Sequence, residues 1–318
     1  MQMSINKSKF DKKKVKRFLF GGLEGGGFVT KLFLYMILIG ISFIFMYPLL
    51  KMIVTSFMGL EDLIDPTTIW IPSNLVISNY TRAIEALKFW DALVDSLEVA
   101  IFPTICAVLS SSLIGYGFAH YEFPGKKLWF AALIIVFLVP TILLQIPTYV
   151  IYNELGLIGS LKSYLYPALS GFGIRQPVFI FIFYQFFKGM PKELGESAEV
   201  DGANAFQTFL KIAVPMAIPA FIICTLYSFV WYWNETSLAT SYFGKTYTTL
   251  QMAVANFERQ FELMFPSGNV GMNEIGQKFN QGVHFAGTML SILPVLILYA
   301  FTQKWFVESA DRAGIAGN

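Results

Sequence analysis

The amino-acid sequence predicts an all-α membrane protein, and three observations lead to that fold class. Hydrophobic residues make up 55% of the 318 residues, and the mean hydropathy is +0.57. Charged residues make up only 14%, whereas soluble domains usually carry about 25%. A helix needs roughly 20 apolar residues to cross the core of a bilayer. Six segments meet that length, and we expect membrane-spanning helices at about 32–54, 97–120, 128–151, 163–187, 212–234 and 280–303.

The first segment follows a basic N-terminus and could be mistaken for a signal peptide. Its apolar run from Leu32 to Leu50 has 19 residues without a charge, whereas a cleavable signal core has about 7–15. We therefore expect a retained helix there. The fourth segment differs from the other five because Arg175 divides it into two charge-free runs of 12 residues.

The distribution of lysine and arginine predicts how these helices are oriented. Six spans put both termini on one side, and 15 of the 23 Lys and Arg residues fall on that side, mostly in short segments beside the spans. Such segments are cytoplasmic in most membrane proteins. We therefore expect a basic cytoplasmic arm at 1–31, a six-helix transmembrane domain at 32–303 and a cytoplasmic tail at 304–318.

Two loops on the opposite, extracytoplasmic side are long. They cover residues 55–96, which carry six acidic residues, and residues 235–279, which are rich in Gly, Asn and Phe. Each is long enough to form a small outer surface on which a partner could dock. Plain connecting loops are the equally open alternative.

The motifs of common enzyme and metal sites are absent from the sequence. There is no GxxxxGK[ST] phosphate loop, no HExxH, no CxxC and no GxSxG. The chain has two cysteines and two histidines, and the cysteines lie far apart in apolar runs. We predict no catalytic site, no metal site and no nucleic-acid partner. Any energy that the chain uses must then come from a partner.

The segment 188–215 is a polar interruption between two apolar spans and is predicted to be cytoplasmic. Pro191 suits the first turn of a helix, and Gly202 suits a helix end because glycine adopts positive φ easily. Asn204 can cap a second helix, and Pro215 ends its pattern. The second helix is expected to carry one apolar stripe made of Phe206, Phe209, Leu210 and Ala213.

A short helix–glycine–helix segment of this kind suits docking into a groove of another protein. The alternative is a helix that lies on the bilayer surface. The stretch GESAEVDGA is net acidic, and anionic lipids would repel it. The pattern therefore favours a protein partner.

This segment resembles the EAA loop of binding-protein-dependent ABC import permeases. The family pattern has E-A-A, three residues, G, nine residues, I, one residue and L-P. Glu196, Ser197 and Ala198 occupy the E-A-A positions, Gly202 follows at the family spacing, and Ile212, Val214 and Pro215 close the pattern. Ser197 and Val214 are small departures. NY at 79–80, QFFKGMPKEL, WYWNET and the C-terminal LPVLILYAFTQKWFVESADRAGIAG also look like carbohydrate-type permeases, so that the similarity covers about 30–318.

The resemblance implies a type I ABC importer permease fold of six transmembrane helices with a cytoplasmic coupling loop. By motif match, the loop would contact an ABC ATPase dimer, which binds the ATP and Mg²⁺; this chain itself would hold no cofactor. A second, different permease would complete a heterodimer in the bacterial cytoplasmic membrane. A solute-binding protein would deliver a sugar or oligosaccharide to the outer face. The implied coupling residues are Glu196, Ser197, Ala198, Asp201, Gly202, Phe206 and Pro215.

Other solutes and mechanisms stay open at this level. A polyamine, a phosphate ester or a peptide could use the same coupling. A stand-alone channel or secondary carrier is a third hypothesis, and a docking site for an ATPase separates it from the other two.

Five residues are candidates for the solute path. Arg175 and Gln176 lie in the middle of the fourth span, where a charge usually faces a cavity or a partner; a structural helix break is the alternative. Trp231, Trp233 and Asn234 end the fifth span, and their rings and amide suit a sugar. An interfacial aromatic belt is the alternative for these three.

Overall fold

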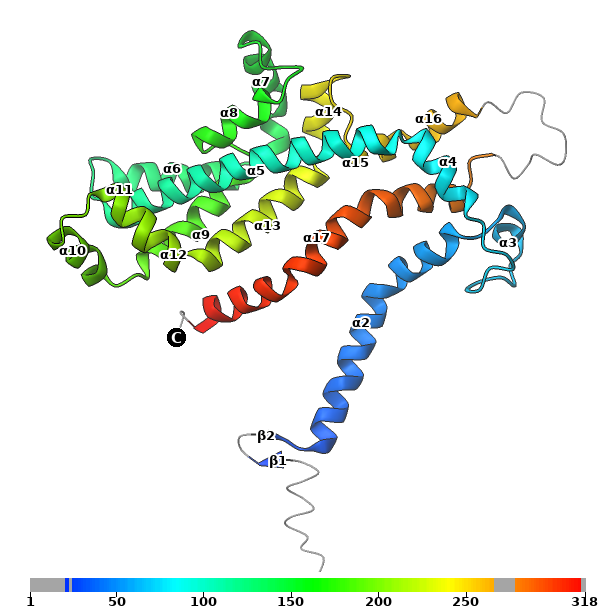
Figure 1. Cartoon of the computed structure of the whole chain (residues 1–318), viewed down its shortest axis with the longest axis horizontal. Helices are drawn as coiled ribbons and strands as arrows, with labels where there is room; N and C mark the ends of the chain where they lie inside the picture. The colour runs from blue at the N-terminus through cyan, green and yellow to red at the C-terminus, as the bar shows by residue number, and fades with distance from the viewer. Residues whose placement is uncertain (1–20, 23–24, 266–277, 316–318) are drawn as a thin grey trace, which may run out of the picture. The chain divides into compact units, whose positions relative to one another are not determined.

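The computed structural model describes residues 21–22, 25–265 and 278–315, which form parts of two compact units, Met1–Val76 and Ile77–Asn318. Most of the described residues are helical, and loops connect the helices (Figure 1). The described strands are an antiparallel pair of two residues each, β1 (Gly21–Gly22) and β2 (Gly25–Gly26).

The first unit contains one long apolar helix and a folded loop. Helix α2 (Phe28–Ser56) covers the first predicted span, and α3 (Leu60–Ile64) follows it. The loop returns to the end of α2, because the Val76 amide donates to the Phe57 carbonyl at 2.9 Å. The buried Asp62 carboxylate accepts the Ser73 amide hydrogen at 3.2 Å. This part of the predicted outer loop 55–96 is therefore ordered by internal hydrogen bonds.

Helix α5 (Phe89–His120) is the central helix of the second unit. At 32 residues it is about 48 Å long, which exceeds the roughly 30 Å core of a bilayer. Small residues let other helices approach it closely: a Cβ added at Gly115 would lie 2.7 Å from Phe183 Cβ. The helices packed directly on α5 include α4 (Ser78–Ala86), α8 (Lys162–Ser170), α9 (Gln176–Lys188) and α13 (Ile218–Asn234), while α17 (Gln281–Ile315) packs on α13 and α4.

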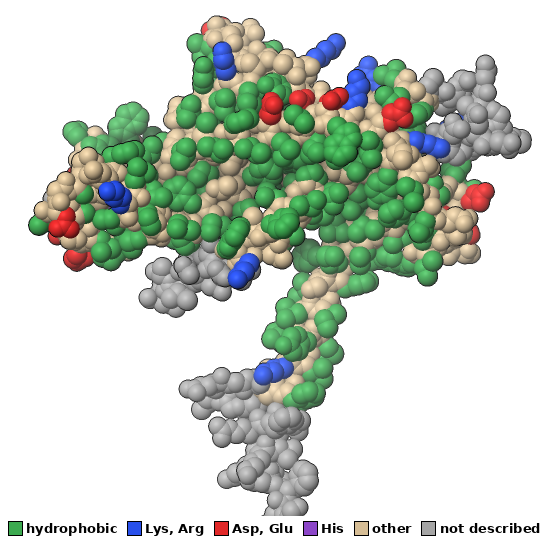
Figure 2. All heavy atoms as spheres, viewed as in Figure 1, with side chains coloured by type: hydrophobic (Ala, Val, Ile, Leu, Met, Phe, Trp, Pro, Cys, Tyr) green, Lys and Arg blue, Asp and Glu red, His purple; other side chains and the backbone are tan. Residues whose placement is uncertain are grey.

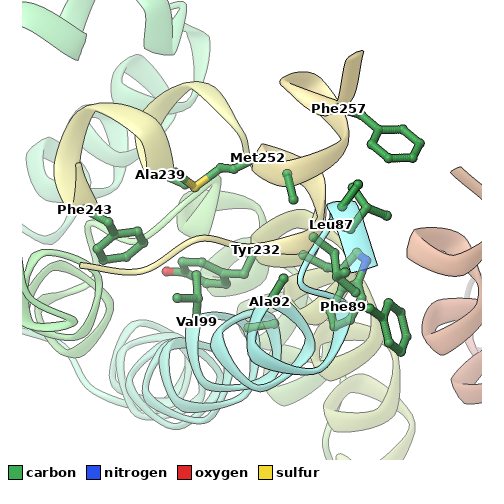
Figure 3. Packing of buried hydrophobic residues seen from close by; sticks show 14 of the residues in the cluster. Leu87, Phe89, Ala92, Val99, Tyr232, Ala239, Phe243, Met252 and Phe257 are labelled. Carbon is green, nitrogen blue, oxygen red and sulfur yellow. The ribbon is translucent and has the colours of Figure 1, made fainter. Parts of the chain in front are cut away.

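Two buried clusters hold this unit together. The larger one joins α4, α5, α8, the end of α13 and three short helices of the predicted loop 235–279. Figure 3 shows Tyr232 of α13 with Val99 of α5 and Phe243 in this cluster. The predicted loop therefore folds onto the bundle where it is described. Its helices are α14 (Ser237–Phe243), α15 (Leu250–Ala255) and α16 (Phe257–Met264).

The second cluster is mainly aromatic and lies at the other end of α5. It contains Tyr116 of α5, Phe179, Phe183 and Phe187 of α9, and Phe209. These rings are fully or nearly fully buried. The second cluster is the part of the core that contacts the segment 188–215, so it determines how that segment is attached to the bundle.

The prediction of six membrane spans is only partly confirmed. Three helices are long and apolar enough to cross a membrane: α2, α5 and residues 281–305 of α17. In two further pairs of helices, the two members reach the length and apolar composition of a span only when they are taken together. Helices α6 (Lys126–Leu138) and α7 (Thr141–Glu154) are bent by 104°, and residues 205–216 are bent by 78° from α13. The predicted spans at 128–151 and 212–234 are therefore each divided by a bend and are not straight helices.

Proline accounts for the first bend, and a helix break divides the fourth predicted span. Val139 is extended because a residue that precedes proline avoids the α region, and Pro140 follows it. The segment 163–187 is divided into α8 and α9, of 9 and 13 residues, and neither is long enough to cross alone. Helix α17 continues to Ile315, so no helix end separates the sixth predicted span from the tail.

The surface of the second unit is largely apolar. Figure 2 shows hydrophobic side chains over most of the visible face of the helices, with few charges among them. Many large apolar side chains of α5, α6, α7 and α17 are exposed, among them Phe102, Leu138, Ile146 and Phe301. Such a surface is unfavourable in water and matches hydrocarbon, as expected of membrane helices.

Candidate functional site

The first half of the segment 188–215 is an α-helix that ends at Gly202, as the sequence predicts. Helix α10 (Lys192–Val200) follows Pro191 directly. Gly202 has φ +83°, and the Ala203 amide donates to the Ala198 carbonyl at 2.9 Å. This bond is typical of a helix end with glycine in the left-handed region. No atom lies within 4 Å of a Cβ built on Gly202, so glycine is required there by the backbone alone.

The second half begins with the predicted cap. The Asn204 side chain accepts the Gln207 amide hydrogen at 2.9 Å, and the Asn204 amide donates to Gln207 Oε1 at 2.9 Å. This reciprocal pair is a capping box at the start of α11 (Ala205–Thr208). The N-x-x-Q spacing at 204–207 is the signal by which the sequence could have identified Gln207.

A π-helical turn follows α11 and divides the predicted apolar stripe. The turn η1 covers Phe209–Ala213, and α12 (Val214–Met216) contains Pro215. Proline has no N–H to continue an α-helical bond pattern, and wide turns are common at such places. Phe209 and Ala213 are buried, whereas Phe206 is 64% exposed. Because η1 is π-helical, the four residues no longer share one face.

The exposed surface of this segment is both acidic and apolar. Glu196, Ser197, Asp201 and Pro215 are exposed, and Ala198 is nearly buried. The exposed apolar side chains are Leu194, Val200, Phe206 and Leu210. Ser197 Oγ donates to the Leu194 carbonyl at 3.1 Å. The hydroxyl that distinguishes Ser197 from the alanine of the family pattern is therefore hydrogen-bonded within α10.

An aromatic contact links this segment to the bundle. The ring of Phe209 lies 5.0 Å from that of Tyr116 on α5 and 6.2 Å from that of Phe187 on α9. Tyr116 and Phe187 are themselves 5.3 Å apart, edge to face. A displacement of η1 must therefore move or repack rings on two long helices. Tyr116 and Phe187 were not among the predicted residues, because nothing in their local sequence indicates this contact.

The break between α8 and α9 is held by Gln176. Its side chain is fully buried, and its amide nitrogen lies within hydrogen-bonding distance of Ser110 Oγ (2.6 Å), the Ala168 carbonyl (2.9 Å) and the Ala107 carbonyl (3.2 Å). Its Oε1 accepts the Gly173 amide hydrogen at 2.6 Å. These bonds tie α5, α8 and α9 together. The geometry favours a structural role for Gln176 over the predicted place on a solute path.

Arg175 precedes α9 and is exposed. Its backbone has φ +50°, and Lys88 is the other non-glycine residue with positive φ in the described ranges. The guanidinium carbon lies 5.2 Å from the ring centroid of Trp231 on α13, within the distance of a cation–π interaction. Phe179 stacks on Trp231 at 5.1 Å. The structure thus brings together two predicted path residues, Arg175 and Trp231.

The other two residues of the fifth span are in different surroundings. Trp233 is buried in the larger cluster and stacks on Phe229 at 5.5 Å. Asn234 is exposed, its amide donates to the Val230 carbonyl at 2.9 Å, and its Oδ1 accepts from Gln251 at 3.4 Å. The geometry therefore favours Asn234 over Trp233 for contact with a solute.

Asp65 and Tyr242 are among the groups with shifted pKa values that lie outside the helices long enough to span a membrane. The amide and hydroxyl of Thr67 lower the pKa of Asp65 below its usual value. Burial raises the pKa of Tyr242 to about 12. Within the described residues, no group of three or more His, Cys, Asp and Glu side chains could hold a metal ion.

The apolar helical bundle and its exposed polar segment define a multi-pass membrane protein. Residues 107–310 match the family described as binding-protein-dependent transport system inner membrane component, and the chain belongs to that family. It is therefore an inner-membrane transport permease.

Characterised relatives and a solved structure agree with this assignment. The arabinooligosaccharides transport system permease AraQ of Halalkalibacterium halodurans is 27% identical over 87% of this chain and 93% of its own length. The trehalose transport system permease SugB of Mycobacterium tuberculosis is 27% identical over 78% of this chain and 84% of its own. A bacterial ABC transporter involved in import of the acidic polysaccharide alginate shares the fold, with a TM-score of 0.71 and 20% identity over 89% of this chain and 99% of that chain.

Proposed function

We propose that this chain is one permease subunit of an ATP-driven ABC importer that moves a sugar or oligosaccharide into the cytoplasm. The observation that carries the proposal is the exposed α10–Gly202–α11 segment in a member of this transport family. The chain itself is proposed to be non-catalytic. ATP and Mg²⁺ would be bound by a partner ATPase dimer.

The segment 188–215 is the proposed contact with that ATPase, with the helix–glycine–helix of α10 and α11 at its centre. Its exposed apolar side chains need a groove, and its exposed carboxylates, Glu196 and Asp201, can pair with basic groups of the partner. Phe209 connects the segment to α5 and α9 through Tyr116 and Phe187. The proposed coupling element contains Glu196, Ser197, Ala198, Asp201, Gly202, Phe206 and Pro215.

The proposed topology has six crossings in a bacterial cytoplasmic membrane, with both termini in the cytoplasm. The bent pairs α6–α7 and α12–α13 each form one crossing, and α8–α9 form another that is broken at Arg175. A second, different permease would complete the translocation path. An extracytoplasmic solute-binding protein would dock on the outer surface, to which 55–96 and 235–279 contribute.

The sugar class is supported by the relatives, whose names specify arabinooligosaccharides and trehalose. The aromatic and amide side chains at the end of α13 suit sugar rings and hydroxyls. A non-sugar solute that uses the same coupling is the alternative, and failure of the complete transporter to import any sugar probe would favour it.

Gly202→Val tests the coupling role, and Gly156→Val is its matched control. Gly156 also has positive φ, +65°, with nothing within 4 Å of an added Cβ, but it lies in the loop after α7. Both variants therefore impose the same kind of backbone strain. The complete transporter is reconstituted in proteoliposomes, and ATP-driven uptake of arabinotriose and maltotriose is measured together with ATP hydrolysis.

We expect Gly202→Val to lower uptake at least tenfold relative to the hydrolysis rate, with membrane insertion intact. Gly156→Val should stay within twofold of wild type. Equal uptake per ATP in the two variants would contradict the coupling role. Purification of an active transporter that contains no ATPase subunit would instead support a channel or secondary carrier.

A further inference from the structure

The guanidinium of Arg175 lies near the middle of the fourth predicted span. Twelve uncharged residues precede it in 163–174, and twelve follow it in 176–187. A charge at that depth is costly in hydrocarbon and normally faces a cavity, a pathway or a partner. Its position therefore calls for a group of opposite charge or for water.

The backbone at Arg175 is held in place before any ligand binds. Gln176 is fully buried and accepts the Gly173 amide hydrogen, and the Ile174 amide donates to the Tyr232 hydroxyl at 3.3 Å. A Cβ at Gly173 would lie 2.6 Å from Gln176 Oε1 and 2.7 Å from the Tyr232 hydroxyl. These contacts hold Arg175 at φ +50°. A strained conformation that its surroundings maintain in this way is common at binding sites.

The side chain of Arg175 is positioned but its charge is not neutralised by a carboxylate. Trp231 lies under the guanidinium at 5.2 Å, and Phe179 in turn stacks on Trp231. The ion pair found among the described side chains joins Lys126 and Glu122, not Arg175. Since the indole already contacts Phe179 and Arg175, its function here is to orient the guanidinium. The donor edge of the guanidinium is then left for a ligand.

The side chains of α13 that lie near Arg175 are of the kinds that bind sugars, and an ion pair with a partner subunit would not require them. Tyr227, Trp231 and Asn234 recur at i, i+4 and i+7, so they share one face of the helix. Tyr227 is 44% exposed, and Asn234 is exposed. Aromatic rings and amides of this kind contact sugar rings and hydroxyls, whereas a carboxylate of a partner subunit would need only the arginine.

We infer that Arg175 binds the carboxylate of an acidic sugar unit, a uronate, as the solute passes between the helices, and that Trp231 is a positioning residue for Arg175. A guanidinium binds a carboxylate through two parallel hydrogen bonds, which distinguishes a uronate from a neutral sugar of the same size. The inference rests on the proposed function as a sugar importer and specifies its solute class.

The test compares acidic and neutral probes of equal length. The complete transporter in proteoliposomes is supplied with trigalacturonate, trimannuronate, the methyl ester of trigalacturonate, arabinotriose and maltotriose. Wild type is compared with Arg175→Gln, Arg175→Lys and Trp231→Leu. Lys127→Gln removes one exposed positive charge from α6, outside the segment 188–215 and the two proposed outer loops, and is the matched control. Size-exclusion chromatography checks that the two permease subunits stay associated in each variant.

We expect wild type to import at least one uronate trimer and Arg175→Gln to lower that uptake at least tenfold. Uptake of the neutral probes that wild type accepts should stay within twofold, and Arg175→Lys should recover part of the loss. Trp231→Leu should raise KM for the uronate several-fold with little change in kcat. Lys127→Gln should change neither value.

Four results would overturn the inference. Wild type could import only neutral probes, in which case the proposed function stands and the uronate assignment falls. Arg175→Gln could lower acidic and neutral uptake equally. It could also separate the two permeases, which would show that Arg175 pairs with a carboxylate of the partner subunit. Failure of wild type to import any probe would count against the proposed function as well.

Discussion

The chain turns at Gly202 and at Arg175 with the same backbone device, a residue at positive φ between two helices, but the two turns are supported differently. At Gly202 nothing lies within 4 Å of an added Cβ, and the residue is exposed. At Arg175 the neighbouring Gln176 is fully buried and bonded to α5 and α8. The first turn depends on the residue type, and the second depends on its surroundings.

This difference matches the two proposed roles. A segment that docks on a partner needs side chains that point outward, so its turn is made by glycine without support from the core. A site that binds a solute needs its charged group in a fixed position, and buried hydrogen bonds supply that. Helix α9 joins the two regions, because it begins beside Arg175 and ends at Lys188, shortly before α10. A movement of the segment 188–215 could therefore be transmitted through α9 to Arg175.

Gly173→Ala should produce the largest effect and would test the rigidity of the Arg175 turn. The new Cβ would lie 2.6 Å from Gln176 Oε1 and 2.7 Å from the Tyr232 hydroxyl, and overpacking in a buried site typically costs about 1–3 kcal/mol. Gly202→Ala has space but positive φ, so it should cost about 1 kcal/mol. Thermal unfolding of the two variants in detergent measures the difference. Equal melting temperatures would show that the Arg175 turn is not rigid.

Gln176→Leu should produce the next largest loss of stability. It removes the acceptor of the Gly173 amide from a buried place, and an unpaired buried donor costs about 1–3 kcal/mol. Gln207→Leu makes the same exchange in the exposed capping box and should cost less. The same unfolding assay compares the pair. A larger effect at Gln207 would contradict the structural role assigned to Gln176.

Asn204→Ala should lower the stability of the segment 188–215 only. Loss of a helix cap costs about 1 kcal/mol, and Asn204 contacts Gln207 and not the buried clusters. We expect faster hydrogen exchange in residues 204–210 with little change around Arg175. Faster exchange in both regions would mean that they unfold as one unit.

Ser197→Ala should have the smallest effect. Its hydroxyl bonds within α10 and is exposed, and exposed substitutions usually change stability by less than about 0.5 kcal/mol. Uptake per ATP should stay within twofold, because alanine is the residue of the family pattern at this position. A tenfold loss would instead make the Ser197 hydroxyl part of the docking surface.

Local patterns predicted the features that depend on neighbouring residues in the chain. The helix end at Gly202 and the cap at Asn204 were predicted and are confirmed, because both are decided within about six residues. The α6–α7 bend was missed although Pro140 indicates it, since proline within an apolar segment is often tolerated in membrane helices. The exposure of Phe206 against the burial of Phe209 was also missed, because a π-turn shifts the register of the face.

The sequence by itself determined that the chain is a helical membrane protein, where its apolar segments lie, and that residues 192–215 form a helix–glycine–helix segment. These properties follow from composition, hydrophobic length and local hydrogen bonding, which neighbouring residues control. Only the tertiary structure decided that Gln176 is a buried tie while Arg175 beside it is exposed over Trp231, and that Phe209 meets Tyr116 and Phe187. These contacts join residues tens of positions apart, and only the packing of α5, α9 and α13 brings them together.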